Sequence, residues 1–113
     1  MKIYLAIPYT FNPELSHKIA NKVTAELMNK GHVVFSPISH SHHIADHLPD
    51  IVRTDSDWWM SQDLPFVEWA EKLIVVLIGE FGSELAAKSK GVQMELNHAK
   101  KHGKQIEFYE YFG

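Results

Sequence analysis

The chain has 113 residues, 45% of them hydrophobic and 22% charged, so we expect one packed domain over residues 1–113. A net charge of -3 argues against a nucleic-acid-binding protein, and no apolar run approaches the roughly 18 residues of a membrane span. The absence of cysteine excludes a disulfide framework, a thiolate zinc site and a thiol nucleophile. The N-terminus lacks the pattern of a signal peptide, so we expect a cytoplasmic protein with no nucleic-acid or membrane partner.

The first third of the chain predicts a strand, a helix and a second strand. Lys2–Ile7 is short, apolar and followed by proline, as expected of a strand. Asn12 and Pro13 are a good N-cap and first helical residue, and an apolar residue at every fourth position from 15 to 27 gives the helix one buried face. Gly31 ends that helix, and the β-branched and aromatic segment His32–Ser36 predicts the second strand.

The middle of the chain predicts a loop, a helix and a buried strand. Residues Ile38 to about Asp55 are polar and rich in histidine, and we expect a long loop with room for one helical turn. Asp55 or Asp57 caps a helix that runs to Trp69, and Pro65 should kink it or split it in two. Lys72–Ile78 is apolar without alternation, which is typical of a central strand in a parallel sheet.

The last third predicts a loop over residues 79–88, with room for a helical turn at 84–87, then a helix and a final strand. Ser89 opens the helix, Gly103 closes it, and Lys104–Tyr109 forms the strand. The whole order predicts a single-domain α/β fold, a doubly wound Rossmann-like or flavodoxin-like parallel sheet of four to five strands with helices on both faces. Ligands of such sheets bind at the carboxyl ends of the strands.

The motif with chemical content is Ser89-Lys-Gly91-Val-Gln-Met-Glu95, because the G-x-G-x-x-G and P-loop fingerprints are both absent. The first N–H groups of a helix capped by Ser89 form an anion pocket, and Gly91 lets a ligand approach the backbone. Glu95 is flanked at helical spacing by Val92 and Ala99 of the buried stripe, so it points towards the sheet. A buried carboxylate costs several kcal/mol unless it is paired or its pKa is raised. The alternative is a simple helix cap with Glu95 at the wet edge of the stripe.

The chain resembles the nucleoside 2-deoxyribosyltransferase superfamily, especially its small uncharacterised, DUF1937-like and nucleotide-hydrolase branches. The resemblance rests on Ile3-Tyr-Leu-Ala-Ile-Pro8-Tyr9, on Asp63, and on Ser89-x-Gly91-x-x-x-Glu95-x-x-x-Ala99. It implies that Glu95 is a nucleophile that attacks the anomeric carbon and forms a covalent glycosyl-enzyme, as in a retaining glycosidase.

The same resemblance assigns roles to other residues. Asp63 would bind or protonate the departing base or hold the nucleophile, unless it caps a second helical segment after Pro65. Tyr9, with Pro8 in the turn after the first strand, would line the sugar pocket, unless Tyr9 is ordinary packing. Transferases of this superfamily have an aspartate six residues before the nucleophile, whereas hydrolases of nucleoside 5′-monophosphates have a serine. Ser89, between Lys88 and Lys90, therefore favours a nucleotide N-glycosidase.

The histidine-rich segment 40–47 and the pair Trp58-Trp59 have open roles. Histidines in a loop define no metal geometry, so we expect no metal site and no cofactor. A segment that contacts the base or phosphate is favoured, with His40 as the first choice because it is nearest the strand; solvated histidines without a role are the alternative. One tryptophan should pack in the core, and the other should stack on a base or lie in a subunit interface.

Three functions therefore stay open for this chain. The first is a glycosidase of nucleoside 5′-monophosphates, the second is a deoxyribosyltransferase, and the third is a nucleotide-sensing module without turnover. The expected partners are a small-molecule nucleotide or nucleoside and a second copy of the chain, because members of the superfamily commonly dimerise. A structure with Glu95 paired to Lys72 or Lys101, away from any cleft, would exclude both enzymatic functions.

Overall fold

The computed structural model describes residues 1–113, which fold into one α/β unit with eleven elements. The strands are β1 (Lys2–Ala6), β2 (Val33–Phe35), β3 (Lys72–Ile78) and β4 (Gln105–Tyr111). The helices are α1 (Pro13–Asn29), α2 (Pro37–Ser41), the 3₁₀ helix η1 (Ile44–His47), α3 (Asp50–Arg53), α4 (Ser56–Trp69), α5 (Gly82–Lys88) and α6 (Lys90–Lys101).

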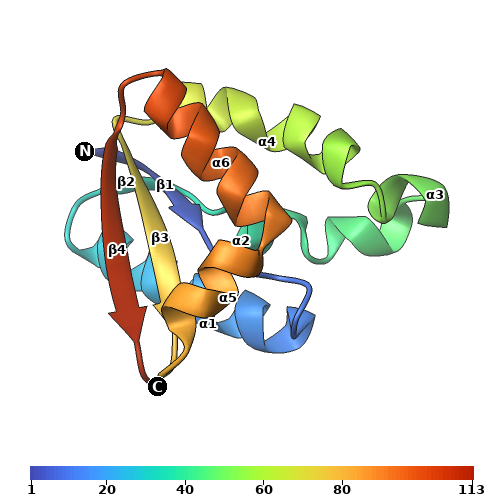
Figure 1. The fold of residues 1–113 in the computed structure, drawn as a ribbon, viewed down its shortest axis with the longest axis horizontal. Helices are drawn as coiled ribbons and strands as arrows, with labels where there is room; N and C mark the ends of the chain where they lie inside the picture. Colours follow the sequence, from blue (N-terminus) through green and yellow to red (C-terminus); the bar gives the residue numbers. More distant parts are fainter.

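The four strands form one parallel sheet in the order β2-β1-β3-β4 (Figure 1). The chain leaves β1 towards β2 on one side and returns to β3 on the other side. A doubly wound sheet binds its ligands at such a switch point, between the carboxyl ends of the two strands. We therefore expect a ligand-binding site at the carboxyl ends of β1 and β3.

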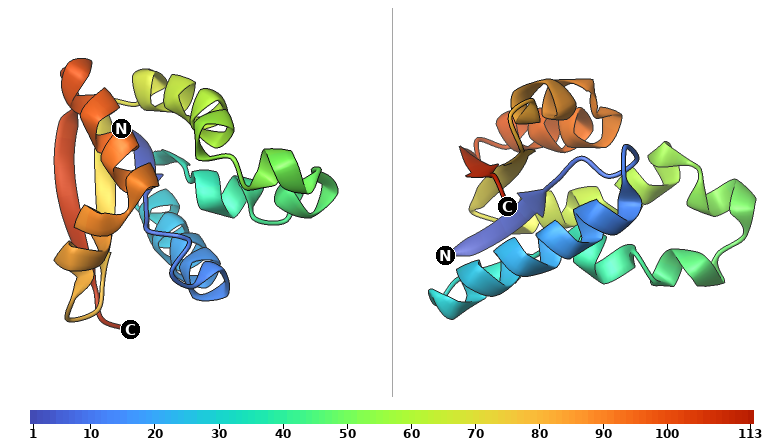
Figure 2. Two further views of the ribbon diagram at one scale, coloured as in Figure 1. Left: turned by 45° about the vertical axis from the view of Figure 1, so that its right-hand side comes forward. Right: turned by 90° about the horizontal axis from the view of Figure 1, so that it is seen from below.

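Helices cover both faces of the sheet, as the view from below in Figure 2 shows for α1 on one side and α5 and α6 on the other. Side chains alternate along β1, so Ile3 and Leu5 pack with Val23 of α1, while Tyr4 and Ala6 pack with residues of α4 and α6. The buried face of α1 contains Ile19, Val23 and Leu27 of the predicted stripe, whereas Leu15 in the first turn is exposed. The expected fold class, with four strands and two helical layers, is confirmed.

The expectation of a long loop from residue 38 to residue 55 is wrong. This segment is a succession of short helical pieces, α2, η1 and α3. Ser36 caps α2 by accepting a hydrogen bond from the N–H of Ser39 at 3.4 Å, and Pro37 occupies the first turn. Ser-Pro at the end of a strand is a helix start, even though the polar composition of residues 38–55 favours a loop.

Two further helices, α5 and α4, differ from expectation. The region after β3 contains α5, which begins where Gly82 lies against the end of the strand; a Cβ there would be 2.7 Å from the carbonyl carbon of Leu77. Glycine thus allows a close helix–strand contact, where sequence suggested a loop. α4 runs unbroken through Pro65, so the division into two helical segments is wrong. None of the helices is long and apolar enough to cross a membrane.

Candidate active site

A cavity of about 270 Å³ opens at the carboxyl end of β1, close to the lower end of the range for small-molecule sites, roughly 300–1,000 Å³. Its walls come from the turn after β1, from the segment α2 to α3, from α4 and from the first turns of α6. The lining residues are Ile7, Tyr9, Thr10, Pro37, Ile38, Ser41, His42, Ala45, Arg53, Ser56, Trp59, Met60, Asp63, Ser89, Lys90, Gly91, Val92 and Glu95.

Glu95 lies in the floor of this cavity and is only 5% exposed. The hydroxyl of Tyr4, a fully buried residue of β1, donates a hydrogen bond to Glu95 Oε2. Glu95 takes part in no salt bridge, and Lys72 instead pairs with Glu107 at 2.8 Å. Glu95 is therefore not paired with Lys72 or Lys101, the arrangement that would have excluded an enzymatic role.

Burial raises the pKa of Glu95 to about 8, and the charge of Asp63 raises it too, while the hydrogen bond from Tyr4 lowers it. Burial and the nearby carboxylates also raise the pKa of Tyr4 well above its usual range, so Tyr4 stays a hydrogen-bond donor. A carboxylate with one firm donor and an otherwise apolar surrounding is a strong nucleophile once it is ionised.

Asp63 faces the same cavity from α4 and is 7% exposed. Because α4 continues through Pro65, Asp63 lies inside the helix, and the alternative of a capping residue is wrong. Burial raises the pKa of Asp63 to about 6. Two buried carboxyl groups with raised pKa values thus face one cavity, and because the charge of Asp63 also raises the pKa of Glu95, one of the two is protonated near neutral pH.

The first turn of α6 forms another wall of the cavity. Ser89 caps the helix by accepting a hydrogen bond from the N–H of Val92 at 3.2 Å, as its sequence predicts. A Cβ at Gly91 would make only an ordinary van der Waals contact, with the Met60 methyl at 3.7 Å. The backbone at the start of α6 can therefore be approached closely by a ligand.

The turn after β1 brings Tyr9 but not Pro8 to the cavity. Tyr9 lines it and shares a hydrogen bond of 2.7 Å between its hydroxyl and His42 Nδ1. Pro8 is buried behind the wall, where its carbonyl oxygen accepts a hydrogen bond from the Ser16 hydroxyl at 2.5 Å. Pro8 thus shapes the turn from outside the lining.

His42, and not His40, is the histidine of this segment that lines the cavity. His40 is exposed and packs its ring against Phe35, 5.5 Å away between ring centroids. The expectation for His40 assumes that the segment is a loop, in which the histidine nearest the strand would also be nearest the ligand. On a helix, residues two apart point to opposite sides, so His42 is turned inwards where His40 is turned outwards.

Sequence reasoning gave no role in the site to Tyr4, His42, Arg53 or Met60, and it did not say which of Trp58 and Trp59 would line the cavity. The sequence could have indicated Tyr4, because a tyrosine in a strand that is covered on both faces needs a hydrogen-bond partner for its hydroxyl. Trp59 lines the cavity and donates from Nε1 to the carbonyl oxygen of Arg53 at 2.8 Å, which ties α4 to α3. Trp58 packs edge-to-face on Trp59, and neither tryptophan is fully buried.

The doubly wound sheet and its paired carboxyl groups define an α/β scaffold with a small-molecule site at the switch point. The family model described as a domain of unknown function, DUF1937, matches residues 1–111, and the chain belongs to this family. No curated protein matches the chain.

Two solved structures are similar to this one. A 2-deoxyribosyltransferase from the psychrotolerant bacterium Bacillus psychrosaccharolyticus is 26% identical with a TM-score of 0.67, covering 100% of this chain and 74% of that enzyme. A 2-deoxyribosyltransferase from Leishmania mexicana is 21% identical with a TM-score of 0.61, covering 96% of this chain and 63% of that enzyme. Both likenesses confirm the predicted fold class, and the likeness to the Bacillus psychrosaccharolyticus enzyme confirms the predicted resemblance to the 2-deoxyribosyltransferases, a superfamily of enzymes.

Proposed function

We propose that this protein is an N-glycosidase that cleaves the base–sugar bond of a (deoxy)nucleoside 5′-monophosphate, with Glu95 as the nucleophile. The observation that carries the proposal is the buried Glu95 carboxyl, held by the Tyr4 hydroxyl beside Asp63 in a cavity of small-molecule size. The similarity to the Bacillus psychrosaccharolyticus enzyme supports glycosyl transfer from a nucleoside as the class of chemistry.

The reaction follows the two displacements of a retaining glycosidase. A carboxylate oxygen of Glu95 attacks the anomeric carbon, the bond from that carbon to the base nitrogen breaks, and its electron pair leaves with the base. The base takes the proton held by Asp63. Water then attacks the same carbon, the bond to Glu95 breaks, and the Asp63 carboxylate takes the proton from the water. The net reaction consumes one water and releases the base and the sugar 5-phosphate.

The shared proton explains how two carboxyl groups can divide these roles. Between about pH 6 and pH 8 the pair holds one proton, from the raised pKa values of Asp63 and Glu95. Because Glu95 has the higher pKa, the proton rests mainly on Glu95, and the reactive form is the minor one, in which the proton lies on Asp63 and the negative charge on Glu95. The Tyr4 hydroxyl favours this form, because its hydrogen bond stabilises the charged state of Glu95.

The cavity wall formed by the first turn of α6 offers a place for the phosphate. Ser89 and the free N–H groups after it lie at the start of α6, where the helix dipole and unpaired donors favour an anion. Lys90 and Arg53 line the same cavity, where Lys90 pairs with Asp57 at 4.0 Å and Arg53 with Asp50 at 2.7 Å, so a phosphate would take over cations that now pair with exposed carboxylates. An aspartate at position 89 would put a carboxylate there, and Ser89 leaves that space neutral.

A deoxyribosyltransferase is the second candidate, favoured by both similar structures. It would use the same Glu95 intermediate and let a second base, in place of water, attack the anomeric carbon. The two functions differ only in the acceptor and in the group that faces the sugar 5′ position.

We further propose that the chain forms a homodimer through the free edge of the sheet. β2 is an edge strand, and an apolar groove beside it is lined by Val33, Val34, Phe35, Pro65, Phe66 and Trp69. Val33 is 57% exposed and Phe66 is 41% exposed, although both are apolar. Light scattering after gel filtration tests this, with Val33→Lys expected to shift a dimer to monomer; a wild-type monomer would contradict it.

The test of function is base release. The protein is incubated with ribo- and deoxynucleoside 5′-monophosphates and with the matching nucleosides, and free base is measured by chromatography. Glu95→Gln, which keeps the shape of the side chain, is the matched control. Release from monophosphates that is lost in Glu95→Gln supports the proposal. Release only when a second base is added moves the function to the transferase, and binding without release leaves a nucleotide-sensing module.

A further inference from the structure

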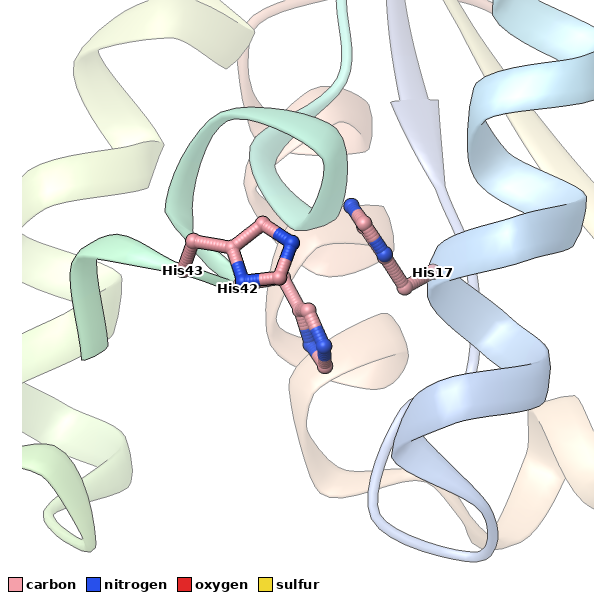
Figure 3. A group of neighbouring side chains, drawn as sticks. All are labelled: His17, His42 and His43. Carbon is pink, nitrogen blue, oxygen red and sulfur yellow. The ribbon is translucent and has the colours of Figure 1, made fainter. Parts of the chain in front are cut away.

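A group of three histidines, His17, His42 and His43, lies where α1 meets α2 (Figure 3). One nitrogen from each ring lies within 4.8 Å of the others. His17 comes from α1, whereas His42 and His43 come directly after the last turn of α2, so the group joins two elements that are distant in the chain. None of the proposed catalytic steps at Glu95 uses this cluster.

The fold supplies the geometry that the sequence lacked. Histidines in a loop fix no ligand positions, but the end of a capped helix does. α1 adds a further side chain able to bind a metal, Glu14, which lies three residues before His17 on the same helical face. Glu14 Oε1 is already 3.1 Å from His42 Nε2.

The charge state of the cluster suits a cation. Glu14 adds a negative charge on a side chain that is 86% exposed and free to adjust. His42 is the anchored member, since its side chain is only 8% exposed.

We propose that His17, His42, His43 and Glu14 form a binding site for a divalent transition metal ion such as Zn²⁺. Three imidazoles and one carboxylate are a donor set that suits tetrahedral zinc, with metal–ligand distances of about 2.0–2.2 Å. Such distances place neighbouring ligand atoms roughly 3.3 Å apart, close to the present distance from Glu14 to His42. His17 completes the set by turning out of its stack on His42, where the ring centroids are 4.1 Å apart.

His42 connects this site to the cavity. Its Nδ1 shares a hydrogen bond of 2.7 Å with the Tyr9 hydroxyl, the kind of outer partner that orients a metal-bound imidazole. Because a carboxylate only accepts, we assign the proton of the neutral His42 ring to Nε2, facing Glu14, which leaves Nδ1 to accept from the Tyr9 hydroxyl. With a metal on Nε2 the neutral ring carries its proton on Nδ1 and donates to Tyr9. The Tyr9 proton is then free to point into the cavity.

A second group, Glu68, His98 and His102, also brings three metal-binding side chains within 4.8 Å. Here the Lys104 ammonium donates to the Glu68 carbonyl oxygen at 2.7 Å, which places a positive charge beside the carboxylate and opposes a dication. This group has no fourth ligand in contact and no buried anchor. It therefore serves as the internal control.

The test is calorimetric titration of Zn²⁺ into the full chain near pH 7.5, with Co²⁺ absorption to report the coordination geometry. We expect one tight site per chain in the wild type and in His102→Ala. His17→Ala and His43→Ala should each weaken it at least about 10-fold, since even outer-partner changes cost about 10–100-fold in metal affinity. The His43 side chain is 78% exposed, so its removal leaves the fold intact, which circular dichroism checks.

Three results would overturn the site: no stoichiometric Zn²⁺ binding to the wild type, unchanged affinity in either His17→Ala or His43→Ala, or loss of binding in His102→Ala. None of these results depends on base release, so the metal site and the glycosidase function stand or fall separately.

Discussion

Tyr4 and Glu95, separated by 91 positions in the chain, meet in the floor of the cavity, where the tyrosine hydroxyl donates to the carboxylate. β1 presents Tyr4 to the face covered by α6, and the second turn of α6 presents Glu95 to the sheet. The pair is a product of the doubly wound topology, which brings the first strand under the last helix. Its hydrogen bond opposes the burial that raises the pKa of Glu95.

Tyr4→Phe should move the alkaline limb of the kcat/KM profile to higher pH and lower its maximum. The change removes the donor that lowers the Glu95 pKa, so a larger share of the pair keeps its proton on Glu95. A hydrogen bond to a charged group is worth about 1.5–3 kcal/mol, which corresponds to roughly 1–2 pH units. An unchanged limb, measured over the full pH range, would show that Tyr4 does not control Glu95.

The wild-type kcat/KM profile should be bell-shaped, with limbs near pH 6 and pH 8. These limbs correspond to the raised pKa values of Asp63 and Glu95, because only the singly protonated pair is reactive. Asp63→Asn should lower kcat by about 10²–10⁴-fold through loss of the proton donor. It should also lower the remaining pKa, since the charge of Asp63 raises that of Glu95. Full activity in Asp63→Asn would contradict the assigned role.

The free energy of unfolding should fall as the pH rises from about 4.5 to about 8. Burial raises the pKa of Glu95 from an unfolded value of 4.5 to about 8, so its favourable contribution is complete below pH 4.5 and is lost through the folded pKa. Glu95→Gln removes the part of this dependence that comes from Glu95 and should be more stable than the wild type at pH 9, by a few kcal/mol at most; Asp63, whose pKa burial raises from 3.8 to about 6, keeps its own smaller dependence. Urea unfolding at pH 5 and pH 9 measures the stability of both proteins. If the wild type and Glu95→Gln lose the same stability between these pH values, Glu95 is not buried in its uncharged form.

Ser89→Asp should change the substrate preference of the protein from nucleoside 5′-monophosphates to nucleosides. Aspartate caps a helix as well as serine does, so the hydrogen bond to Val92 and the start of α6 survive. The new carboxylate repels a phosphate at the same helix end, and a cost of about 1.4 kcal/mol already changes the ratio of kcat/KM values tenfold. Ser89→Asn, uncharged and of the same size, is the matched control. Equal effects of the two substitutions would remove the electrostatic explanation.

Local sequence signals were sufficient for the sheet, for α1 and for α6. Asn12, Pro13 and Ser89 occupy the capping and first-turn positions that they predict, and Lys72–Ile78 is the central strand that its unbroken apolar run predicts. These elements depend on near neighbours in the chain. The position of Glu95 on the buried face of α6 could be predicted from helical spacing for the same reason.

The parts that sequence missed depend on contacts between distant segments. α5 requires the close approach of Gly82 to Leu77, and the partnership of Tyr4 with Glu95 requires knowing which strand lies under which helix. The inward position of His42 requires knowing that residues 37–41 are helical. Each of these is decided by packing, which outweighs the local preference of a polar or proline-containing segment.

The most direct test of the covalent mechanism is the configuration at the anomeric carbon when methanol competes with water as the acceptor. Two displacements at Glu95 predict a methyl glycoside with the same configuration as the nucleotide, which proton NMR can identify because a methyl glycoside, unlike the free sugar, does not change its configuration in neutral solution. Glu95→Gln should form none. A methyl glycoside of inverted configuration would mean that the acceptor attacks the nucleotide directly, and Glu95 would then not be the nucleophile.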